Sequence, residues 1–388
     1  MKLPENWKKL RIGELGVIQA GGTPSKKNIS FWKGSIPWVS SSDISEDNIH
    51  NISVRNYITE TAVLKSSTKI IRKNSLLVVS RVGVGKIVIT PFDICTSQDF
   101  QNLTIKSEKI FNIYIAYFLK FKINELITFN QGTSIKGFVK SDFENFEILI
   151  PPIEEQKAIA DLLSSWDEAI EKTEKLIKLK EKKFKWLLNE LISEKAVKRN
   201  PEAWKKVKLG SLFNEEIKVE KGRALTKKTK INGHIPVVAG GQSYAYYTNV
   251  PTHNFPTVTV SSSGAYAGFI WYHNYPIWAS DCNVFYLKKG NTKFLYYVLK
   301  RIQHKIYKLQ SGGAQPHIYS KDMRNLVVFW TTEKEKLRII DILTSAQREI
   351  ELLTQITEKY KLQKKGLMQK LLTGTWRIKS EIIDKYKK

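Results

Sequence analysis

The sequence predicts an α+β protein in which two similar mixed α/β domains are separated by a long antiparallel two-helix coiled coil, with pseudo-two-fold symmetry. Three observations lead to this prediction. The second half of the 388-residue chain repeats the first. Each copy ends in a long heptad-patterned segment, and each places short strand and turn patterns ahead of that segment.

The internal repeat is the strongest of these signals. Residues 131–192 align without a gap on residues 311–372, at an offset of 180. The segment 4–16 returns at 201–213 with an offset of 197, so the first copy carries about 17 extra residues between its start and its middle. Self-similarity at a fixed offset indicates duplicated structural units, and differences in length are expected in surface loops. The chain is therefore predicted to contain two versions of one unit.

A heptad seam identifies a long amphipathic helix in each copy. In the first copy, spacings of four and three residues alternate, and only Thr173 and Lys180 interrupt the apolar pattern. The first seam consists of Ile159, Leu163, Trp166, Ile170, Thr173, Ile177, Lys180, Phe184, Leu187 and Leu191, and the second of Ile339, Leu343, Ala346, Ile350, Leu353, Thr357, Tyr360, Lys364, Leu367 and Leu371. Pairing of the two helices is preferred to separate packing of each on its own domain, because a seam of roughly 50 Å is longer than one domain face usually needs.

The ends of these helices carry recognisable start signals. The proline pair at 151–152 precedes the first helix, and Thr332 with Glu335 matches a capping box before the second. A short basic linker at 193–208 leaves no room for the chain to travel back along the first helix, so the second domain begins where that helix ends. The second helix must then return, which makes the coil antiparallel. The predicted segments are a first domain at 1–150, a first helix at 151–197, a second domain at 198–331, and a second helix with the C-terminal tail at 332–388.

Each domain shows the same order of local patterns. A strand, a turn and a second strand are predicted at 76–90 in the first copy and at 257–273 in the second. A helix follows at 110–128 and at 293–309, respectively. Both domains are therefore predicted to be mixed α/β.

The charge balance indicates a polyanionic partner. Lys and Arg number 63 against 37 Asp and Glu, a net charge of +26. Double-stranded DNA is the favoured partner, and a membrane surface is the competing one, although no basic amphipathic helix stands alone at a terminus. The sequence contains no apolar run near 18 residues and no leader with a cleavage site, so the protein is expected to be soluble and cytoplasmic.

The usual signatures of catalysis and cofactor binding are missing. The GVGK at 83–86 is not a phosphate loop, because Ile87 stands where Ser or Thr would bind magnesium. The histidines show neither metal spacing nor a nucleophile partner, and Cys95 and Cys282 are expected to be buried structural thiols. We therefore predict no catalytic residue, metal or cofactor in this chain. A hidden site that uses single carboxylates remains the alternative.

Four stretches carry a resemblance to a known family: GGTPS…IPWVSSSDI at 21–44, GTSIKGFVKSDFENFEILIPPIEEQKAIADLL at 132–163, its copy at 312–343, and KKGLMQKLLTG at 364–374. They resemble the specificity subunits of type I restriction-modification enzymes. The second copy departs from the pattern, because a Thr-Thr-Glu-Lys-Glu stretch replaces the Pro-Pro-Ile-Glu-Glu helix start. The resemblance covers nearly the whole length of the chain.

This resemblance implies a function without catalysis. In the family, two target recognition domains each read one half of a bipartite DNA site. Paired helices hold these domains apart and dock two methyltransferase subunits. S-adenosylmethionine is expected on the methyltransferase partner, and ATP with magnesium on a restriction subunit where one joins. The alternatives are a stand-alone pseudo-two-fold DNA-binding regulator, which would bind without a methyltransferase, and a structural scaffold, which would leave the positive charge unexplained.

Candidate DNA-contacting residues are polar or basic side chains on predicted turns, where they could reach base edges or phosphates. In the first domain they are Thr23, Ser25, Lys26, Arg81, Lys86, Gln98 and Lys136, and in the second Lys221, Arg223, Lys227, Gln242, Tyr266, Gln315 and His317. A residue of this kind taken alone is more often a solvated loop residue, but together, on turns with aromatic neighbours, these residues form a candidate DNA footprint.

Candidate partner-contacting residues are apolar side chains beside the seams, which widen the apolar surface beyond what a two-helix coil requires. They are Leu162, Leu176, Leu179, Trp186 and Leu188. We expect them to meet helices of the methyltransferases. Contact with the chain's own domains is the alternative.

Overall fold

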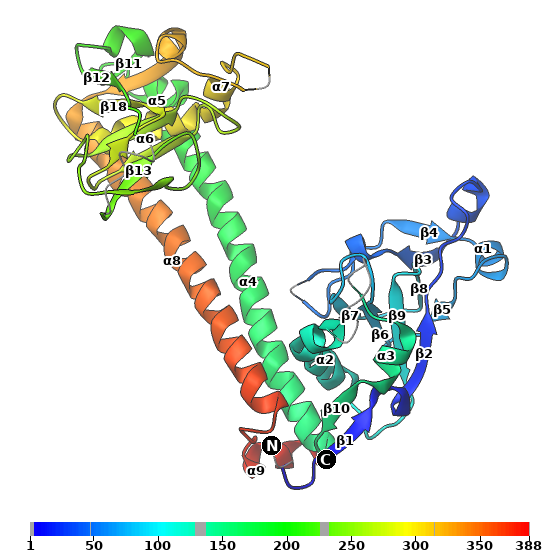
Figure 1. Cartoon of the computed structure of the whole chain (residues 1–388). Helices are drawn as coiled ribbons and strands as arrows, with labels where there is room; N and C mark the ends of the chain where they lie inside the picture. Colours follow the sequence, from blue (N-terminus) through cyan, green and yellow to red (C-terminus); the bar gives the residue numbers. More distant parts are fainter. Residues whose placement is uncertain (1–3, 47, 129–136, 226–232, 314, 388) are drawn as a thin grey trace. The chain divides into compact units, whose positions relative to one another are not determined.

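The chain folds into two compact units. The computed structural model describes residues 4–46, 48–128, 137–225, 233–313 and 315–387. Unit 1 comprises Met1–Glu174 and Ile356–Lys388, and unit 2 comprises Lys175–Gln355. The long helices α4 (Ile153–Leu191) and α8 (Glu333–Leu372) each contribute to both units (Figure 1). Both long helices that the heptad pattern predicts are therefore present.

Unit 1 contains two β-sheets, one antiparallel and one mixed, and a short two-stranded ribbon. One sheet has the order β2-β9-β6-β7 with antiparallel neighbours, and the other has the order β4-β3-β8-β5, in which β3 and β8 are parallel. The ribbon pairs β1 with β10. The strands are β1 (Lys8–Arg11), β2 (Gly16–Ala20), β3 (Ile36–Val39), β4 (Asn56–Ile58), β5 (Ile70–Ile71), β6 (Leu76–Val79), β7 (Ile87–Ile89), β8 (Ile94–Thr96), β9 (Phe100–Ile105) and β10 (Glu147–Ile150).

Strand β6 shows how the layers of unit 1 pack. Leu76 and Val78 belong to the core that α2 (Asn112–Thr128), α4 and α8 share, whereas Leu77 and Val79 belong to the core between the two sheets. Successive side chains of a strand point to opposite faces, so a strand covered on both faces must be apolar throughout. This explains the continuous apolar sequence of β6.

Unit 2 repeats this topology. Its larger sheet has the order β12-β18-β15-β16 with antiparallel neighbours, its smaller sheet has the order β14-β13-β17, and β11 pairs with β19. Strands β13 and β17 are parallel, as β3 and β8 are in unit 1. The strands are β11 (Trp204–Lys208), β12 (Ile217–Lys221), β13 (Ile235–Val238), β14 (Tyr246–Thr248), β15 (Thr257–Ser261), β16 (Ile270–His273), β17 (Trp278–Ala279), β18 (Cys282–Leu287) and β19 (Val327–Thr331). The structure thus confirms two similar mixed α/β domains.

The helix predicted at 293–309 is divided into two. It consists of α6 (Thr292–Arg301) and α7 (Gln303–Tyr307), whereas its counterpart in unit 1, α2, is continuous. Ile302 interrupts it with φ −98° and ψ 11°, and its backbone N–H donates to the carbonyls of the preceding turn. The Ile302 side chain is buried in the core of unit 2. Apolar periodicity cannot reveal such a break, because the pattern continues across it.

Within each unit α4 and α8 run antiparallel. In unit 1 Asp167 pairs with Lys364, whereas Glu174, further along α4, pairs with Lys361 at 2.9 Å. In unit 2 Lys180 pairs with Glu349, whereas Leu188, further along α4, shares a core with Ile339. A residue further along α4 thus meets an earlier residue of α8, so the direction predicted from the short linker is confirmed. The ends of both helices are also part of the domain cores, so helix pairing and domain packing occur together.

The start of α8 differs from the predicted capping box. Both carboxylate oxygens of Glu335 accept hydrogen bonds from Arg338, at 3.0 and 2.6 Å, instead of reaching back to the preceding turn. An arginine one turn later is a stronger donor to a carboxylate than a neutral backbone N–H. The shorter helices are α1 (Glu60–Leu64), α3 (Lys140–Asn145), α5 (Glu194–Arg199) and α9 (Ser380–Ile383), with 3-10 turns at Ile12–Glu14, Ile29–Trp32, Ser41–Asp43, Leu209–Leu212, Asp322–Asn325 and Asp384–Tyr386.

Both cysteines are free and buried, as the sequence predicts. Burial raises the pKa of Cys95 to about 11 and that of Cys282 to about 12, so both remain thiols. None of the helices in the described part of the chain combines the length and the apolar character that crossing a membrane would require.

Candidate nucleic-acid interface

In unit 1 several loops meet at one end of the sheets. Loop cluster 1 is defined by residues 21–28, 40–43, 80–86 and 97–99. The Ser80 N–H donates to the Asp99 carbonyl at 2.7 Å, and the Lys86 amine donates to the Ser41 carbonyl at 3.0 Å. The Thr23 hydroxyl donates to the Gln98 side-chain carbonyl. Each loop is therefore bonded to another, and segments far apart in the sequence form one surface.

The framework beneath loop cluster 1 fixes its first loop. The Gly22 N–H donates to the Thr96 carbonyl at 2.8 Å, and the Trp38 indole donates to the Gly22 carbonyl at 2.9 Å. A Cβ at Gly22 would lie 2.4 Å from the Thr68 nitrogen, so no larger residue fits there. The loop is consequently held tightly where it leaves the sheet.

Six of the seven candidates in the first domain lie in loop cluster 1. The side chains of Lys26, Arg81 and Gln98 are exposed. Gln98 keeps its amide nitrogen without a partner among the described residues, and a side-chain amide can read adenine through paired hydrogen bonds. The Ser25 carbonyl accepts the Trp32 indole N–H at 3.2 Å. The seventh candidate, Lys136, lies outside the described residues.

Unit 2 builds the corresponding surface from different sequences. Loop cluster 2 is defined by residues 222–225, 239–245, 261–268, 311–313 and 315–318. The Ser261 hydroxyl donates to the Gly240 carbonyl at 2.9 Å, and the Gly264 N–H donates to the Pro316 carbonyl at 3.0 Å. Residues 263 and 317 also form an isolated antiparallel bridge. Here too, loops distant in sequence are bonded into one surface.

Six of the seven candidates in the second domain are described by the structure. Gln242, Tyr266, Gln315 and His317 belong to loop cluster 2, and the His317 ring lies parallel to that of Tyr319, with centroids 6.4 Å apart. Arg223 is exposed, and its carbonyl accepts the Trp278 indole N–H at 2.8 Å. Lys221 is the exposed last residue of β12, directly before the cluster. Lys227 lies outside the described residues.

Particular bonds recur at matching places in the two clusters. The Ser262 N–H donates to the Asp281 carbonyl at 3.1 Å, as that of Ser80 does to Asp99. Gly83 and Gly264 begin the corresponding turns with φ of +80° and +81°, a conformation that glycine adopts without strain. Asp99 of unit 1 and Asp281 of unit 2 therefore hold matching places in the backbone of the two clusters.

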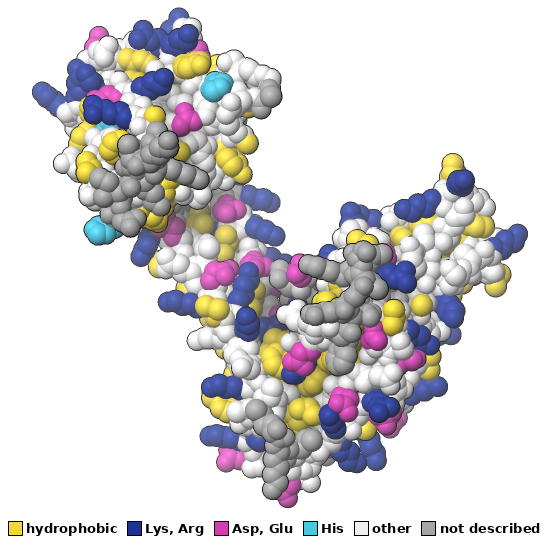
Figure 2. Space-filling model, in the orientation of Figure 1, with side chains coloured by type: hydrophobic (Ala, Val, Ile, Leu, Met, Phe, Trp, Pro, Cys, Tyr) yellow, Lys and Arg dark blue, Asp and Glu magenta, His cyan; other side chains and the backbone are white. Residues whose placement is uncertain are grey.

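Lysine and arginine side chains are abundant on the visible surface of both units (Figure 2). Figure 2 shows Lys and Arg side chains spread over both units on the face in view, with Asp and Glu between them. Within the described residues, no group of three or more His, Cys, Asp or Glu is arranged to hold a metal ion. Long-range attraction of a polyanion, followed by contacts from polar loop residues, is the chemistry that this arrangement can perform.

The structure separates the predicted partner-contacting residues into two groups. Leu179 and Trp186 are 61% and 58% exposed, and Leu176 is also exposed. Leu188 is only 5% exposed and belongs to the core of unit 2, so its assignment to a partner surface is wrong. Leu162 is half-buried against the core of unit 1. The heptad pattern could not distinguish these positions, because the domains cover both ends of α4.

Sequence reasoning missed two cations, Arg301 and Lys305. They lie near the junction of α6 and α7, which the sequence treats as one helix. A comparison of the two copies could have identified them. The repeat places Phe121 and Glu125 at these positions in unit 1, so the two cations are specific to the second copy.

The comparison with known families agrees with this geometry. The family model described as the type I restriction modification DNA specificity domain matches residues 4–181 and 201–362. The chain belongs to this family. The two matched stretches correspond to the duplicated pattern, so the repeat in the sequence is a repeat of the specificity domain.

Individual members of the type I specificity family are similar to this chain over different spans. The MjaIX specificity subunit of Methanocaldococcus jannaschii is 32% identical, over 57% of this chain and 54% of that protein. The EcoR124I/EcoR124II specificity subunit of Escherichia coli is 34% identical, over 48% of each. The chain thus spans about half the length of these two curated relatives. The MjaVIII subunit of M. jannaschii is 25% identical, over 98% of this chain and 95% of that protein.

Solved structures share the fold. The S subunit of a type I restriction-modification system from M. genitalium matches with a TM-score of 0.65 and 19% identity, over 96% of this chain and 98% of that one. A chain from a study of the assembly and conformational transition of the type I system matches with a TM-score of 0.62 and 18% identity, over 96% and 99%. At these identities the matches establish the specificity-subunit fold and not the target.

Proposed function

We propose that this protein is the sequence-specific DNA-recognition subunit of a type I restriction-modification complex, and that it reads a bipartite target. The observation that carries this proposal is that both units form a loop surface at the same place on the same scaffold. Loop clusters 1 and 2 stand at corresponding ends of matching sheets, yet their side chains differ. Two copies of one scaffold with different loops suit the reading of two different half-sites.

The chemistry of the clusters supports direct readout. Base pairs in the major groove present distinct donor and acceptor patterns, and exposed Arg81, Gln98 and Gln242 offer matching groups. Phosphate contacts by the surplus of Lys and Arg would fix the register on the duplex. The net charge of +26 then accounts for affinity, and the loops account for sequence preference.

The partners follow from the family. Two methyltransferase subunits would dock on the helices, with exposed Leu176, Leu179 and Trp186 available as apolar contacts. S-adenosylmethionine would be bound by the methyltransferases, and ATP with magnesium by restriction subunits where these join. The chain itself would be non-catalytic and would act in the cytoplasm, where the DNA lies.

Methylation sequencing of the host genome tests this proposal. Deleting the gene should remove one bipartite methylation motif. Arg81→Ala should keep that motif but relax one base position in one half-site, at a cost of about 1–3 kcal/mol in discrimination. A motif that survives deletion would refute the proposal. Purified chain that binds its site tightly without a methyltransferase would favour the stand-alone regulator.

Arg72→Ala is the matched control. Arg72 is an exposed arginine of the same unit, but it precedes β6 whereas Arg81 follows it, and it pairs with Asp93 at 2.7 Å. Its removal should leave the motif unchanged. Equal effects of the two substitutions would mean that loop cluster 1 does not read bases.

A further inference from the structure

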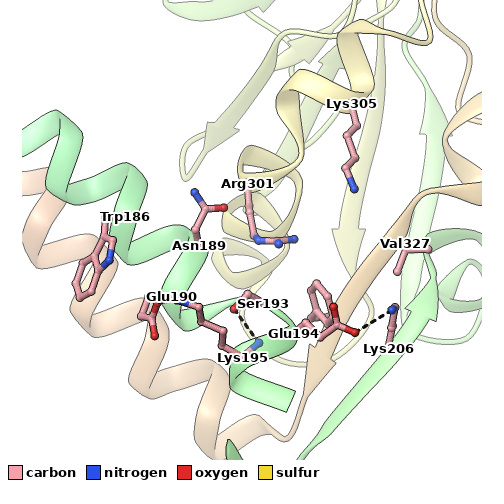
Figure 3. Close-up of a pocket in the computed structure, with 11 residues that line it drawn as sticks. Trp186, Asn189, Glu190, Ser193, Glu194, Lys195, Lys206, Arg301, Lys305 and Val327 are labelled. Atoms are coloured by element: carbon pink, nitrogen blue, oxygen red, sulfur yellow. Dashed lines mark hydrogen bonds and ion pairs between the residues drawn. The ribbon is translucent and has the colours of Figure 1, made fainter. Parts of the chain in front are cut away.

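Unit 2 contains a groove that the loop clusters do not include. It lies between the end of α4, helix α5, strands β11 and β19, and the junction of α6 and α7, and it has a volume of about 540 Å³. Figure 3 shows Arg301 and Lys305 extending into the same space, which Asn189 of α4 and Lys206 of β11 border. Trp186 stands at its rim and is 58% exposed. We call this space the α4–α7 groove.

The carboxylates in the α4–α7 groove already have cationic partners. Glu190 accepts from Lys195 at 3.1 Å and from Arg199 at 2.5 Å. Glu194 pairs with Lys206 at 3.2 Å. The negative groups of the groove are therefore neutralised by neighbours other than Arg301 and Lys305.

Arg301 and Lys305, by contrast, have no ion pair with any described residue. The Arg301 Nε is buried and finds no hydrogen-bond acceptor there, while its guanidinium lies 5.0 Å from the Phe329 ring centroid. Burial lowers the pKa of Arg301, but an arginine in a protein remains a cation. The two Nη groups of Arg301 are not buried and bond to no described residue, so they are the donors that an anionic oxygen in the groove could meet.

The fold does not require these cations. In unit 1 the equivalent positions hold Phe121 and Glu125, and Glu125 pairs with Lys122 at 2.5 Å. In the β1–β10 ribbon of unit 1, Glu147 pairs with Lys9 at 2.5 Å. In the β11–β19 ribbon of unit 2, Val327 replaces the glutamate, and Lys206 stands in place of the lysine. Unit 1 thus balances its charges at this place and unit 2 does not.

The α4–α7 groove is connected to loop cluster 2. Gln303 of α7 donates to the Gly268 carbonyl at 2.5 Å, and Gln310 donates to the Ala267 carbonyl at 2.8 Å. An adjoining pocket of about 480 Å³ shares Asn189 and Arg301 and adds Lys300 and other polar groups. The α6–α7 segment that carries Arg301 and Lys305 is therefore bonded to the loop that carries Tyr266.

We propose that the α4–α7 groove binds phosphate groups of the DNA backbone beside the half-site that loop cluster 2 reads. This inference rests on the proposed function. The planar guanidinium of Arg301 matches two phosphate oxygens, and Lys305 adds a point charge. DNA is favoured over an acidic protein segment because the helices that carry Arg301 and Lys305 are bonded to loop cluster 2, to which the proposed function assigns DNA reading. Unit 2 would then hold DNA by contacts that unit 1 lacks.

Salt titration of DNA binding tests the groove. The full chain, with its methyltransferases, would be titrated against a duplex carrying the methylated motif. Lys305→Gln and Arg301→Gln should each reduce the slope of log K against log salt by about 0.9, and weaken binding about tenfold near 0.1 M salt. The methylation motif should stay unchanged, since phosphate contacts carry no base information.

Lys289→Gln provides the matched control. It removes the same charge from an exposed lysine just before α6, at the end of that helix opposite to Arg301. Slopes of Lys305→Gln and Arg301→Gln equal to that of Lys289→Gln would overturn the proposal. Loss of methyltransferase co-elution with an unchanged slope would overturn it in favour of an acidic protein partner. A failure of the proposed function itself would give a different result. In that case the unsubstituted complex would not prefer a duplex that carries the motif over one that lacks it.

Discussion

Units 1 and 2 join their helices to their domains at the same positions but with different chemistry. Tyr117 and Tyr297 are repeat equivalents, and each hydroxyl lies near a hydroxyl of a long helix, Ser164 at 3.2 Å and Thr344 at 3.1 Å. In unit 1 the Tyr117 hydroxyl also donates to the Asp167 carboxylate at 2.6 Å. Burial, together with that carboxylate, holds the pKa of Tyr117 far above its usual range, so the hydroxyl remains a donor.

The carboxylate that Tyr117 contacts is replaced in unit 2. Asp167 pairs with Lys364 of α8, and both side chains are almost completely buried. The repeat places Gln347 and Phe184 at the corresponding positions in unit 2. There, Phe184 packs edge to face on the Tyr297 ring, with centroids 6.3 Å apart. This joint, the place where a long helix packs on the repeat-equivalent tyrosine of its domain, therefore accommodates either an ion pair or an aromatic contact.

This difference shows what the joint requires. A buried ion pair and a well-packed apolar pair can stabilise a protein equally, because desolvation offsets the Coulomb attraction. Removing one member alone is different, because the other charge is left buried. What these positions require is that no charge is left buried without a partner, more than a particular kind of contact.

Lys364→Phe should have the largest effect. It leaves Asp167 buried without its cation and should reduce the stability of unit 1 by about 3–5 kcal/mol. Adding Asp167→Gln, which removes the unpaired charge and reproduces the residues of unit 2, should recover most of that loss. Amide hydrogen exchange of peptides from α2 and α4, followed at increasing urea concentration, would give the unfolding free energy of unit 1 in both variants. A double variant no more stable than Lys364→Phe would show that the two joints are not interchangeable.

Acidification should distinguish the units by a smaller amount. His273 ends β16 opposite Thr257, and burial lowers its pKa to about 3. The pKa of this histidine in the unfolded chain is about 6.5, so below that pH the unfolded chain binds a proton that the folded unit does not bind. Stability contributed by neutral His273 is complete above pH 6.5 and declines as the pH falls toward 3. Between pH 6.5 and 5 the loss should be about 2 kcal/mol for unit 2.

Unit 1 provides the contrast for this prediction. Thr90, which follows β7 and bonds to the Ser75 carbonyl at 3.0 Å, occupies the corresponding place and does not titrate. His273→Gln should remove the loss in unit 2 between pH 6.5 and 5, measured by hydrogen exchange of β15 peptides. An unchanged pH dependence in that variant would assign the effect to other groups.

The sequence predicted the repeated and periodic features best. An offset of 180 determined that the two halves share one scaffold, and the seam spacing predicted both long helices. The turn residues at Arg81, Gln98 and Gln242 were correctly placed on loops, because glycines and strand patterns bracket them. These signals are local or internal to the sequence, so no coordinates were needed to find them.

Features that depend on tertiary contacts were not predictable in this way. Lys180 and Lys364 both interrupt a seam, but the sequence could not show that one is buried against Asp167 and the other partly exposed. Leu188 fits a partner surface by its position on the helix, yet the second domain covers it. The break at Ile302 is equally invisible, because its cause is a backbone turn within an unbroken apolar pattern.

The seam lysine of unit 2 should have the smallest effect. Lys180 pairs with Glu349 at 2.5 Å, but their side chains are 26% and 49% exposed. Water screens such a pair and the side chains lose rotamer freedom, so Lys180→Met should change the stability of unit 2 by less than about 1 kcal/mol. Exchange of α8 peptides in 0.05 and 0.5 M salt would measure this, with Lys364→Met as the comparison. If Lys180→Met were as costly as Lys364→Met, burial could not be what distinguishes the two seam lysines.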